Sequence, residues 1–354
     1  MKQKLAYIVS SLGVGGVEVA LMSAVPELNK NFDFKLICLG SYNPDFLIGL
    51  SESERNNMIV FRGFPFNYFK ALFYILKFEP NIIITSLWKA TPIGILTKLI
   101  KSKIKYVEFI HSSVYFHSFD KLFTKLALKS ADAVFCDSAS AKAFVEMQGC
   151  RKPIEIISFL RFQSPTQWQP KQHVSLKALY VGRFNEYKRI DRLVLLAKKL
   201  VDSGLHFQVD LYGRNDGTMD LIKSLIKENQ LETTVFLKGE IVSDKVQGLF
   251  SGYDFYFQTS DVEGMAMSVV EAMQHGLICV VTNVGEIRNY AGNGYNAVVI
   301  DEDFNLTTTV EQIKEICNNL QLANTISKNA RLTFAGQEDF ANSLIKALNN
   351  NIHA

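Results

Sequence analysis

The sequence predicts an α/β protein built from two doubly wound parallel sheets, and three observations support this fold class. Short, almost wholly apolar runs alternate with amphipathic runs along the chain, which is typical of parallel strands covered by helices on both faces. The alternation stops once, near residue 163, and then starts again. The length of 354 residues suits two domains better than one.

The first half predicts a domain over residues 1–162. Its β-branched apolar runs predict strands, and runs with apolar residues three or four apart predict helices. The predicted strands are LAYIVSS, FKLICLG, MIVFRG, NIIITSL, KYVEFIH and AVFCDS, and the predicted helices are GVEVALMSAVPEL, FNYFKALFYILKF and FDKLFTKLALKSA. The segment 163–174, with two prolines and four glutamines and no period, predicts a linker.

The second half repeats the pattern and predicts a domain over residues 175–337. The predicted strands are KALYVGR, FQVDLYG, VFLKGE, DFYFQTS, ICVVTN and NAVVID, and the predicted helices include RIDRLVLLAKKLVDSG and DLIKSLIKENQ. A last helix over about 338–354 is expected to pack back on the first domain. In such sheets ligands bind beyond the carboxyl ends of the strands, so the turns from strand to helix are the candidate sites.

Composition narrows the class of protein. Hydrophobic residues make up 48% and charged residues 21%, an ordinary globular balance that argues against disorder. The five cysteines are odd in number and form no CxxC pair, so we expect free thiols in a reducing cytosol. The apolar run over 81–100 is interrupted by Lys89 and Pro92, and the N-terminal run breaks at glycines, so neither a spanning helix nor a signal peptide is predicted.

The net charge of +3 is unevenly distributed. Residues 1–168 hold 20 Lys and Arg against 13 Asp and Glu, and residues 62–129 hold 11 against 3. Such an asymmetry indicates either an anionic partner of the first domain or simply solvated helix faces. Nucleic acid is not expected as a partner.

A glycine cluster follows the first predicted strand. Gly13, Gly15 and Gly16 open the first helix, where free backbone N–H groups favour an anion. The dinucleotide spacing GxGxxG is not met, and the second strand does not end in an acidic residue, which disfavours a dehydrogenase. A tight turn without a ligand is the alternative.

Two cations lie at the first strand-to-helix turn of the second domain. Arg183 follows the strand KALYVG, and Lys188 comes five residues later. Arginine and lysine at such a turn can bind a diphosphate, the former by bidentate hydrogen bonds. A salt bridge to Glu186 or Asp191 is the alternative.

Two glutamates bracket the apolar segment EGMAMSVVEAMQHG. Glu263 lies in the loop after a strand, and Glu271 lies within a helix expected over about 266–275, with Gly276 as its terminator. A glutamate in an apolar helix needs hydrogen-bond partners, which ligand hydroxyls or a structural partner would supply.

These motifs together resemble glycosyltransferase family 4, the retaining group 1 transferases of the GT-B fold. EGMAMSVVE resembles the E-x7-E segment of that family, VGRFNEYKRIDRL its G-R-x4-K element, GVGGVE its glycine loop, and FIHSSVYF the region of its histidine. They occur in the family's order over most of the chain. The resemblance implies two Rossmann-like domains facing each other across a cleft, an acceptor-binding domain first and a nucleotide-sugar-binding domain second.

The resemblance also implies roles for single residues. Glu263 and His111 would act at the donor sugar and the reacting centre. Glu271 would bind the ribose. The other donor-binding positions implied are Gly15, Gly16, Arg183, Lys188, Gly264, Met265, Ala266 and Met267. The family often has an aromatic residue at Met265 and Gly or Pro at Ala266, so donor preference does not transfer and these positions would act mainly through backbone N–H groups.

The expected reaction is transfer of a sugar from a nucleotide sugar to a glycan in surface polysaccharide biosynthesis, such as O-antigen or capsule. The expected donor is a UDP-sugar. Cations and helix N-termini would stabilise the departing diphosphate. No metal and no cofactor are expected, because the DED at 301–303 predicts a polar turn and the histidines lack paired-ligand spacing. The alternatives are a nucleotide-sugar 2-epimerase of the same fold, which lacks the joined motifs, and a non-catalytic nucleotide-sugar or polyanion-binding protein.

Basic amphipathic helices in the first domain mix aromatic residues with lysines. FPFNYFKALFYILKF, LTKLIKSKIKY and FDKLFTKLALKS would suit an anionic membrane and a lipid-linked acceptor. The alternative is that their apolar faces only pack on the sheet. The expected location is the cytoplasm, with peripheral attachment to the cytoplasmic face of the inner membrane as a hypothesis.

Overall fold

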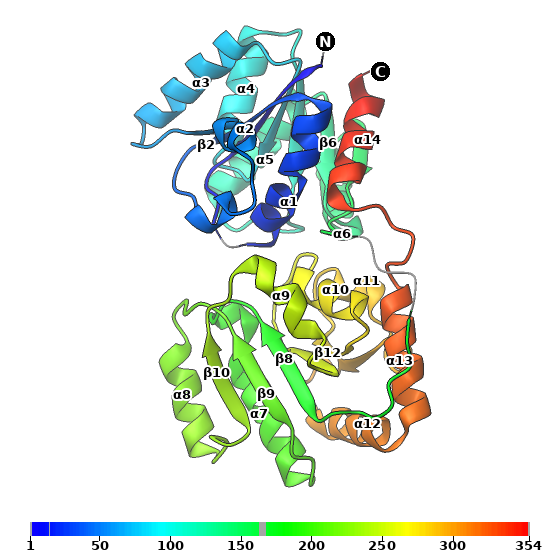
Figure 1. The fold of residues 1–354 in the computed structure, drawn as a ribbon. Coiled ribbons are helices and arrows are strands. Elements are labelled where there is room, and N and C mark those ends of the chain that lie inside the picture. The colour runs from blue at the N-terminus through cyan, green and yellow to red at the C-terminus, as the bar shows by residue number, and fades with distance from the viewer. Residues whose placement is uncertain (1, 14, 163–167, 353–354) are drawn as a thin grey trace. The chain divides into compact units, whose positions relative to one another are not determined.

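The protein divides into two compact units in a computed structural model that describes residues 2–13, 15–162 and 168–352 (Figure 1). Unit 1 comprises residues 1–162 and 338–354, and unit 2 comprises residues 163–337. Each unit has its own parallel sheet, with strands drawn from the apolar runs of its sequence. The predicted fold class, an α/β protein with two doubly wound sheets, is therefore confirmed.

In unit 1 the described strands form a parallel sheet in the order β3-β2-β1-β4-β5-β6-β7. The strands are β1 (Lys4–Val9), β2 (Asp33–Cys38), β3 (Met58–Val60), β4 (Ile82–Ser86), β5 (Lys105–Ile110), β6 (Ala133–Cys136) and β7 (Ile154–Ile156). All the strands predicted for this half are present, and only the short edge strand β7 was not predicted. The central strands are buried on both faces, which explains their continuous apolar sequences.

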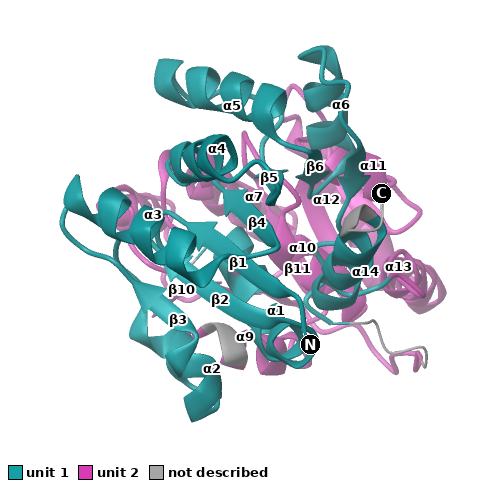
Figure 2. Cartoon of the chain, turned by 90° about the horizontal axis from the view of Figure 1, so that it is seen from above, with its two compact units in different colours: residues 1–162, 338–354 teal, residues 163–337 magenta. Residues whose placement is uncertain are grey.

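The helices of unit 1 cover both faces of this sheet. They are α1 (Gly16–Asn31), η1 (Pro44–Leu47), α2 (Glu52–Asn56), α3 (Phe66–Phe78), α4 (Thr91–Ile100), α5 (Ser118–Ser130), α6 (Ala139–Met147) and α14 (Phe340–Ile352). From β1 the chain first moves to β2 and later returns to β4 on the other side, so right-handed crossovers place α1 on one face and α3, α4 and α5 on the other. Figure 2 shows these helices on opposite sides of the sheet, with α14 beside α1.

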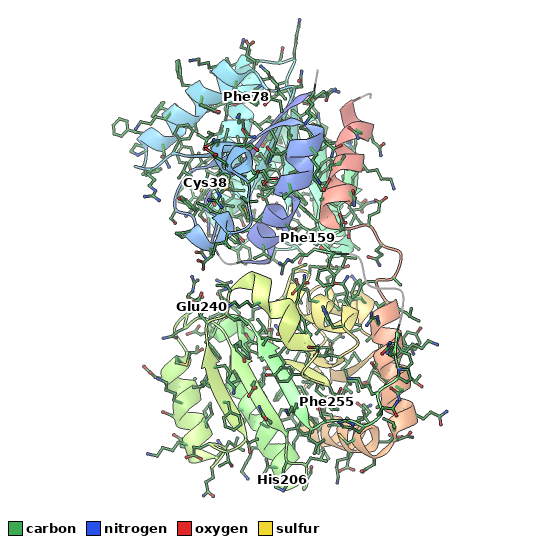
Figure 3. The ribbon with its side chains drawn as sticks, in the orientation of Figure 1. Cys38, Phe78, Phe159, His206, Glu240 and Phe255 are labelled. Atoms are coloured by element: carbon green, nitrogen blue, oxygen red, sulfur yellow. The ribbon has the colours of Figure 1, made fainter. Side chains whose placement is uncertain are left out.

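The last helix belongs to unit 1 although unit 2 precedes it in the sequence. The amide of Phe340 donates to the carbonyl oxygen of Leu160 at 2.7 Å, and the amide of Ser158 donates to Oγ of Ser343 at 3.0 Å. Phe159, labelled in Figure 3, packs edge-on against Phe340 with ring centroids 5.1 Å apart. Helix α14 therefore completes the core of unit 1.

In unit 2 the described strands form a parallel sheet in the order β10-β9-β8-β11-β12-β13. The strands are β8 (Lys177–Val181), β9 (Gln208–Tyr212), β10 (Val235–Gly239), β11 (Phe255–Gln258), β12 (Ile278–Thr282) and β13 (Ala297–Ile300). The helices are η2 (Glu186–Lys188), α7 (Ile190–Asp202), α8 (Met219–Glu228), α9 (Ser243–Phe250), α10 (Met267–Gln274), α11 (Ile287–Tyr290), α12 (Leu306–Asn318) and α13 (Leu320–Leu332). The predicted strands of this half are all present.

Each sheet has one point where the strand order reverses. In unit 1 it lies between β1 and β4, and in unit 2 between β8 and β11. Loops that leave the carboxyl ends of two such strands run in opposite directions and leave room for a ligand. In unit 2 these two loops carry Arg183, Lys188 and Glu263, the residues singled out by their sequence motifs.

The segment predicted as a linker lies partly outside the described residues, since 163–167 are not described. From Trp168 onward it is attached to unit 2. The indole Nε1 of Trp168 donates to Oγ of Ser327 at 3.4 Å, and the amide of Lys171 donates to Oδ1 of Asn324 at 2.8 Å.

All five cysteines are free, and Cys38, Cys136 and Cys279 are buried in strands. None of the helices in the described part of the chain has both the length and the apolar content needed to span a bilayer.

Candidate active site

Lys188 and Glu263 form an ion pair in unit 2. Lys188 ends the short helix η2 after β8, and Glu263 lies in the loop after β11. The Nζ atom of Lys188 lies 2.6 Å from Oε1 and 2.8 Å from Oε2 of Glu263. The Glu263 side chain is only 6% exposed, so water screens this pair weakly. The cation therefore has a carboxylate partner from the neighbouring loop and not Glu186 or Asp191.

Gln258 holds the same carboxylate from the end of β11. Its Nε2 atom donates to Oε1 of Glu263 and also to Oγ of Ser260, the latter at 2.8 Å. Gln258 is 1% exposed, so its amide is fixed in orientation by these partners. Gln258 does not belong to any of the sequence motifs. The signal was a polar residue at the end of a strand whose other residues are aromatic.

The backbone around Glu263 is fastened by the next strand-to-helix turn. The amide of Glu286 donates to the carbonyl oxygen of Gly264 at 3.1 Å, and the hydroxyl of Tyr290 donates to that of Met265 at 3.1 Å. Gly285 has φ +55°, and a Cβ there would lie 2.0 Å from the carbonyl oxygen of Glu263. Only glycine permits this close approach.

Helix α10 begins one residue later than predicted. Ala266 takes the left-handed conformation with φ 53° and ψ 61° as its N-cap. Among the described residues no side chain caps this N-terminus. The first amides of α10, near Met267, thus have no partner within the helix and point from its positive end. The helix ends at Gln274, and Gly276 has φ +74°, as the predicted terminator requires.

Glu271 lies in the middle of α10 and is 4% exposed. Its neighbours Val270 and Ala272 are buried, as the amphipathic pattern indicated. The nitrogen Nδ1 of His275 lies 2.8 Å from the backbone oxygen of Glu271, one turn back along the helix. The role of Glu271 at a ribose stays a prediction.

Arg183 follows β8 at the same end of the sheet. Its Nη1 lies 3.4 Å from Oδ2 of Asp216, and the two side chains are 50% and 41% exposed. Ion pairs this long and this exposed contribute little, so the guanidinium can exchange Asp216 for a ligand phosphate.

Two buried tyrosines fix the backbone before Arg183. The hydroxyl of Tyr180 donates to the carbonyl oxygen of Arg183 at 3.1 Å, and that of Tyr256 donates to the carbonyl oxygen of Val181 at 3.1 Å. Burial raises the pKa of both tyrosines, so each hydroxyl keeps its proton and remains a donor.

In unit 1 His111 joins two residues that the sequence analysis did not select. His111 follows β5, Ser86 ends β4 and Asp137 follows β6, so three adjacent strands supply them. The ring nitrogen Nε2 lies 2.7 Å from Oγ of Ser86, and Nδ1 lies 3.3 Å from Oδ2 of Asp137. The His111 and Asp137 side chains are 6% and 5% exposed.

This arrangement determines the hydrogen positions on the neutral ring. A carboxylate only accepts, so Nδ1 carries the hydrogen and Nε2 accepts from the hydroxyl of Ser86. The ring of Phe109 stacks on the imidazole with centroids 4.3 Å apart. His111 is therefore held in one orientation and one tautomer.

The glycine cluster of unit 1 lies at the start of α1. Gly15 is the N-cap and Gly16 the first helical residue. The carboxylate oxygen Oε2 of Glu18 lies 2.4 Å from where a Cβ on Gly15 would be. A phosphate approaching this turn would have to displace the Glu18 side chain.

The segment Asp301–Asp303 forms a polar turn. Asp301 accepts from Oγ1 of Thr308 at 3.0 Å, and Asp303 accepts from the amide of Asn305 at 3.1 Å. Across the described residues no three His, Cys, Asp or Glu side chains gather as they would around a metal.

Family models match both halves of the chain. The model described as glycosyl transferases group 1 matches residues 167–333, and the model described as glycosyltransferase family 4 matches residues 14–158. The chain is a group 1 glycosyltransferase of family 4. Both matches cover the loops that carry the motifs in their respective halves.

Relatives of this glycosyltransferase span nearly its whole length. An uncharacterized glycosyltransferase of Methanocaldococcus jannaschii is 25% identical over 335 residues, which are 90% of this chain and 89% of that protein. The structure of Anabaena HepE in complex with UDP has a TM-score of 0.82 at 18% identity and covers 98% of this chain and 100% of HepE. The lipopolysaccharide outer core galactosyltransferase WaaB has a TM-score of 0.70 at 16% identity, with 99% of each chain covered. These likenesses establish the GT-B fold.

The structure brings some of the predicted residues of the glycosyltransferase together and leaves others in a different unit. Lys188 and Glu263 are in contact, and Glu263 also leads into α10. Gly15, Gly16 and His111 belong to unit 1, where His111 has its own polar partners. The set that the structure assembles most tightly is thus the one in unit 2.

Proposed function

We propose that this glycosyltransferase transfers a hexosyl or N-acetylhexosaminyl residue from a UDP-sugar to a glycan acceptor, with retention of the anomeric configuration. The observation that carries the proposal is the Lys188–Glu263 ion pair beside the uncapped N-terminus of α10. HepE, which shares the fold, binds UDP and UDP-glucose in its structures and supports this donor class.

The charges in unit 2 suit departure of a nucleoside diphosphate. Negative charge grows on the β-phosphate as the sugar leaves, and Arg183, Lys188 and the first amides of α10 can stabilise it without a metal ion. Backbone N–H groups of Gly264 to Met267 would meet the donor, and the carboxylate of Glu271 would bind the ribose hydroxyls.

Positive charge grows on the sugar ring in the same step. The Glu263 carboxylate, held by Lys188 and Gln258, lies at the strand end where an oxocarbenium-like centre could face it. We propose a front-face displacement in which the leaving phosphate helps to deprotonate the acceptor hydroxyl. In this mechanism Glu263 and His111 position the sugar and form no covalent intermediate.

The acceptor is proposed to be a lipid-linked oligosaccharide of a surface polysaccharide, such as O-antigen or capsule, bound by unit 1. The sugar transfer would then take place in the cytoplasm, with the enzyme attached to the cytoplasmic face of the inner membrane. WaaB, a lipopolysaccharide galactosyltransferase of the same fold, supports a surface glycan as the acceptor class.

Donor turnover tests the proposal. UDP-, GDP- and ADP-sugars are screened by thermal shift, since a ligand at 100 times its Kd stabilises the folded state by about 2.7 kcal/mol. The stabilising donor is then incubated with and without a lipid-linked glycan, and nucleoside diphosphate release and the anomeric form of the product are measured. Release that requires the acceptor and survives a chelator is the expected result. Loss of activity with the chelator would disprove the metal-free mechanism.

A further inference from the structure

The outer sides of α3, α4 and α5 expose an unusual number of large apolar side chains. These helices lie side by side on one face of the unit 1 sheet, α3 against α4 and α4 against α5 (Figure 2). The exposed apolar residues on them are Phe66, Phe69 and Phe73 of α3, Leu96, Leu99 and Ile100 of α4, and Phe119, Leu122 and Leu126 of α5. Phe64 and Phe116 precede α3 and α5 and are exposed as well. We call these eleven residues the outer apolar face.

The spacing on each helix shows a second apolar stripe. Phe66, Phe69 and Phe73 are three and four residues apart, which places them on one side of α3. Ala71 and Ile75, on the opposite side, are buried against the sheet. Packing of the fold therefore explains only the inner stripe, because a helix on a sheet normally has a polar outer side.

The exposed apolar side chains of the outer apolar face are distinguished by their clustering on neighbouring helices, since single apolar residues elsewhere, such as Met147, are equally exposed. Phe69 and Phe73 are 69% and 73% exposed, and Leu99 on α4 is 73% exposed. Clustered exposure of this kind on neighbouring helices is typical of an interaction surface.

Lysines outnumber acidic residues on the three helices that carry the outer apolar face. The lysines within the three helices are Lys70, Lys77, Lys98, Lys121, Lys125 and Lys129, while the acidic residue within them, Asp120, is buried. In the described part of the chain no carboxylate lies within ion-pairing distance of Lys70, Lys125 or Lys129. Lys98 pairs with Asp132.

We propose that the outer apolar face binds an anionic lipid bilayer, with its aromatic and aliphatic side chains inserted below the headgroups and its lysines at the lipid phosphates. Apolar side chains flanked by lysines match the charge and polarity of such an interface. This inference rests on the membrane association within the proposed function and assigns a surface to it.

A second copy of the chain fits this surface less well. A two-fold symmetric contact through the outer apolar face would bring lysines against lysines, since an isologous interface pairs a patch with itself. Like charges at an interface oppose association. An anionic bilayer supplies the missing countercharge.

Vesicle flotation of the full chain tests the proposal. The vesicles are phosphatidylcholine alone or phosphatidylcholine with 30% phosphatidylglycerol, at low and at moderate salt. Binding to the anionic vesicles that weakens with salt is expected, with little binding to the neutral vesicles.

Two sets of variants locate the surface. Phe69→Ser, Phe73→Ser and Leu99→Ser are combined and compared with Leu221→Ser, Tyr295→Ser and Leu332→Ser, which alter exposed apolar residues of unit 2. Lys70→Gln with Lys125→Gln is compared with Lys223→Gln and Lys227→Gln on α8, which are also exposed. Each variant at the outer face should weaken binding by about tenfold or more, since a lysine at an anionic surface contributes about 1 kcal/mol. The unit 2 variants should bind as the unaltered chain does.

Three results would overturn the proposal. They are no binding to anionic vesicles, equal binding by the outer-face and unit 2 variants, or a dimer in size-exclusion chromatography that the serine variants dissociate. The thermal shift of the same variants on addition of the donor distinguishes a failure of the proposed surface from a failure of the proposed function. A variant that binds the donor but not the vesicles supports the surface, whereas failure of all donors to bind would count against the proposed function alone.

Discussion

Lys188 and Glu263 neutralise each other in unit 2, with Nζ at 2.6 and 2.8 Å from the two carboxylate oxygens. One is the cation expected at a diphosphate, and the other is the carboxylate expected at the sugar. A diphosphate that binds here must share Lys188 with Glu263. The two roles are therefore coupled through one ion pair.

Glu263→Gln separates the two roles. The amide keeps the shape of the side chain but no longer neutralises Lys188, so UDP should bind at least as tightly as it does to the unaltered enzyme. Turnover should fall by about 100-fold, in the range measured for loss of one group that stabilises a transition state. Calorimetric titration with UDP and a turnover assay give the two values. Turnover close to normal would show that Glu263 does not act at the reacting centre.

Arg183→Ala should weaken UDP binding by about tenfold or more and slow transfer as well, because a hydrogen bond to a charged group contributes about 1.5–3 kcal/mol. Arg151→Ala, at an exposed arginine of unit 1, is the matched control and should leave both unchanged. Titration with UDP measures the difference. Equal affinity of the two variants would remove Arg183 from the donor site.

Asp137→Asn tests whether the orientation of His111 matters for transfer. The amide of the asparagine can donate to Nδ1, which favours the other tautomer and reverses the hydrogen bond at Nε2, so that the ring donates to Oγ of Ser86. Turnover should fall by about ten- to 100-fold, a range known for residues that orient a ligating histidine. Nitrogen NMR of the His111 ring should show the hydrogen moving away from Nδ1. Asp33→Asn, at an exposed aspartate, is the control. A changed tautomer with normal turnover would exclude a role for His111 in catalysis.

Gly285→Ala and Gly294→Ala separate two effects of an added Cβ: a clash with a neighbouring backbone atom, and the strain of a left-handed backbone conformation. Both glycines have positive φ, +55° and +71°, but only at Gly285 would a Cβ meet another atom within 4 Å, the carbonyl oxygen of Glu263. Gly294→Ala should cost about 1 kcal/mol of unfolding free energy for the left-handed backbone alone. Gly285→Ala should cost more and should also reduce turnover by displacing Glu263. Denaturant unfolding and a turnover assay measure both, and equal costs would contradict the close approach.

The buried Glu108 of β5 should make unit 1 less stable as pH rises. Its carboxylate accepts from Oγ1 of Thr91 at 2.8 Å and from the hydroxyl of Tyr106 at 2.6 Å, and also from Oγ1 of Thr85. Burial nevertheless raises the pKa of Glu108 from 4.5 to about 7. Between these two values the folded state binds more protons than the unfolded state, so the free energy of unfolding falls as pH rises through the window and levels off above about pH 7.

Glu108→Gln removes this proton linkage. Between pH 4.5 and 7 the difference in unfolding free energy, variant minus unaltered chain, should grow by up to about 3 kcal/mol, since each pKa unit corresponds to about 1.4 kcal/mol. Urea unfolding at several pH values gives the difference, and Glu232→Gln at an exposed glutamate serves as the control. A difference that does not depend on pH would mean that Glu108 titrates normally.

The two parallel sheets could be predicted because strands that are buried on both faces have nearly continuous apolar sequences. The runs III in β4 and ICVV in β12 are continuously apolar, and each predicted strand appears in the structure. The strand β7 was missed because it has only three residues, none of them buried, and so shows no apolar pattern. Helix α10 starts one residue late because Ala266 adopts a left-handed cap, which no propensity of alanine indicates.

Single residues of the candidate site could be predicted from their type and their spacing in the sequence, but their contacts could not. Glu263 and Lys188 stood out as charges at strand ends, but their pairing depends on β8 and β11 being neighbours in the sheet, which the chain order does not state. Asp137 and Ser86 were missed for the same reason. Each ends an apolar strand as many polar residues do, and only the order β4-β5-β6 places them on either side of His111.

Helix α14 lies beside α1 in unit 1, although the chain reaches it only after all of unit 2 (Figure 1). During synthesis the ribosome therefore releases residues 1–162 long before Phe340 is available to pack on Phe109 and Phe159. Unit 2 is continuous in sequence and can finish folding first. Until the codons of α14 are read, the nascent first unit has an open core, and a premature stop near residue 338 would leave a protein with an intact second unit and an unfinished first one.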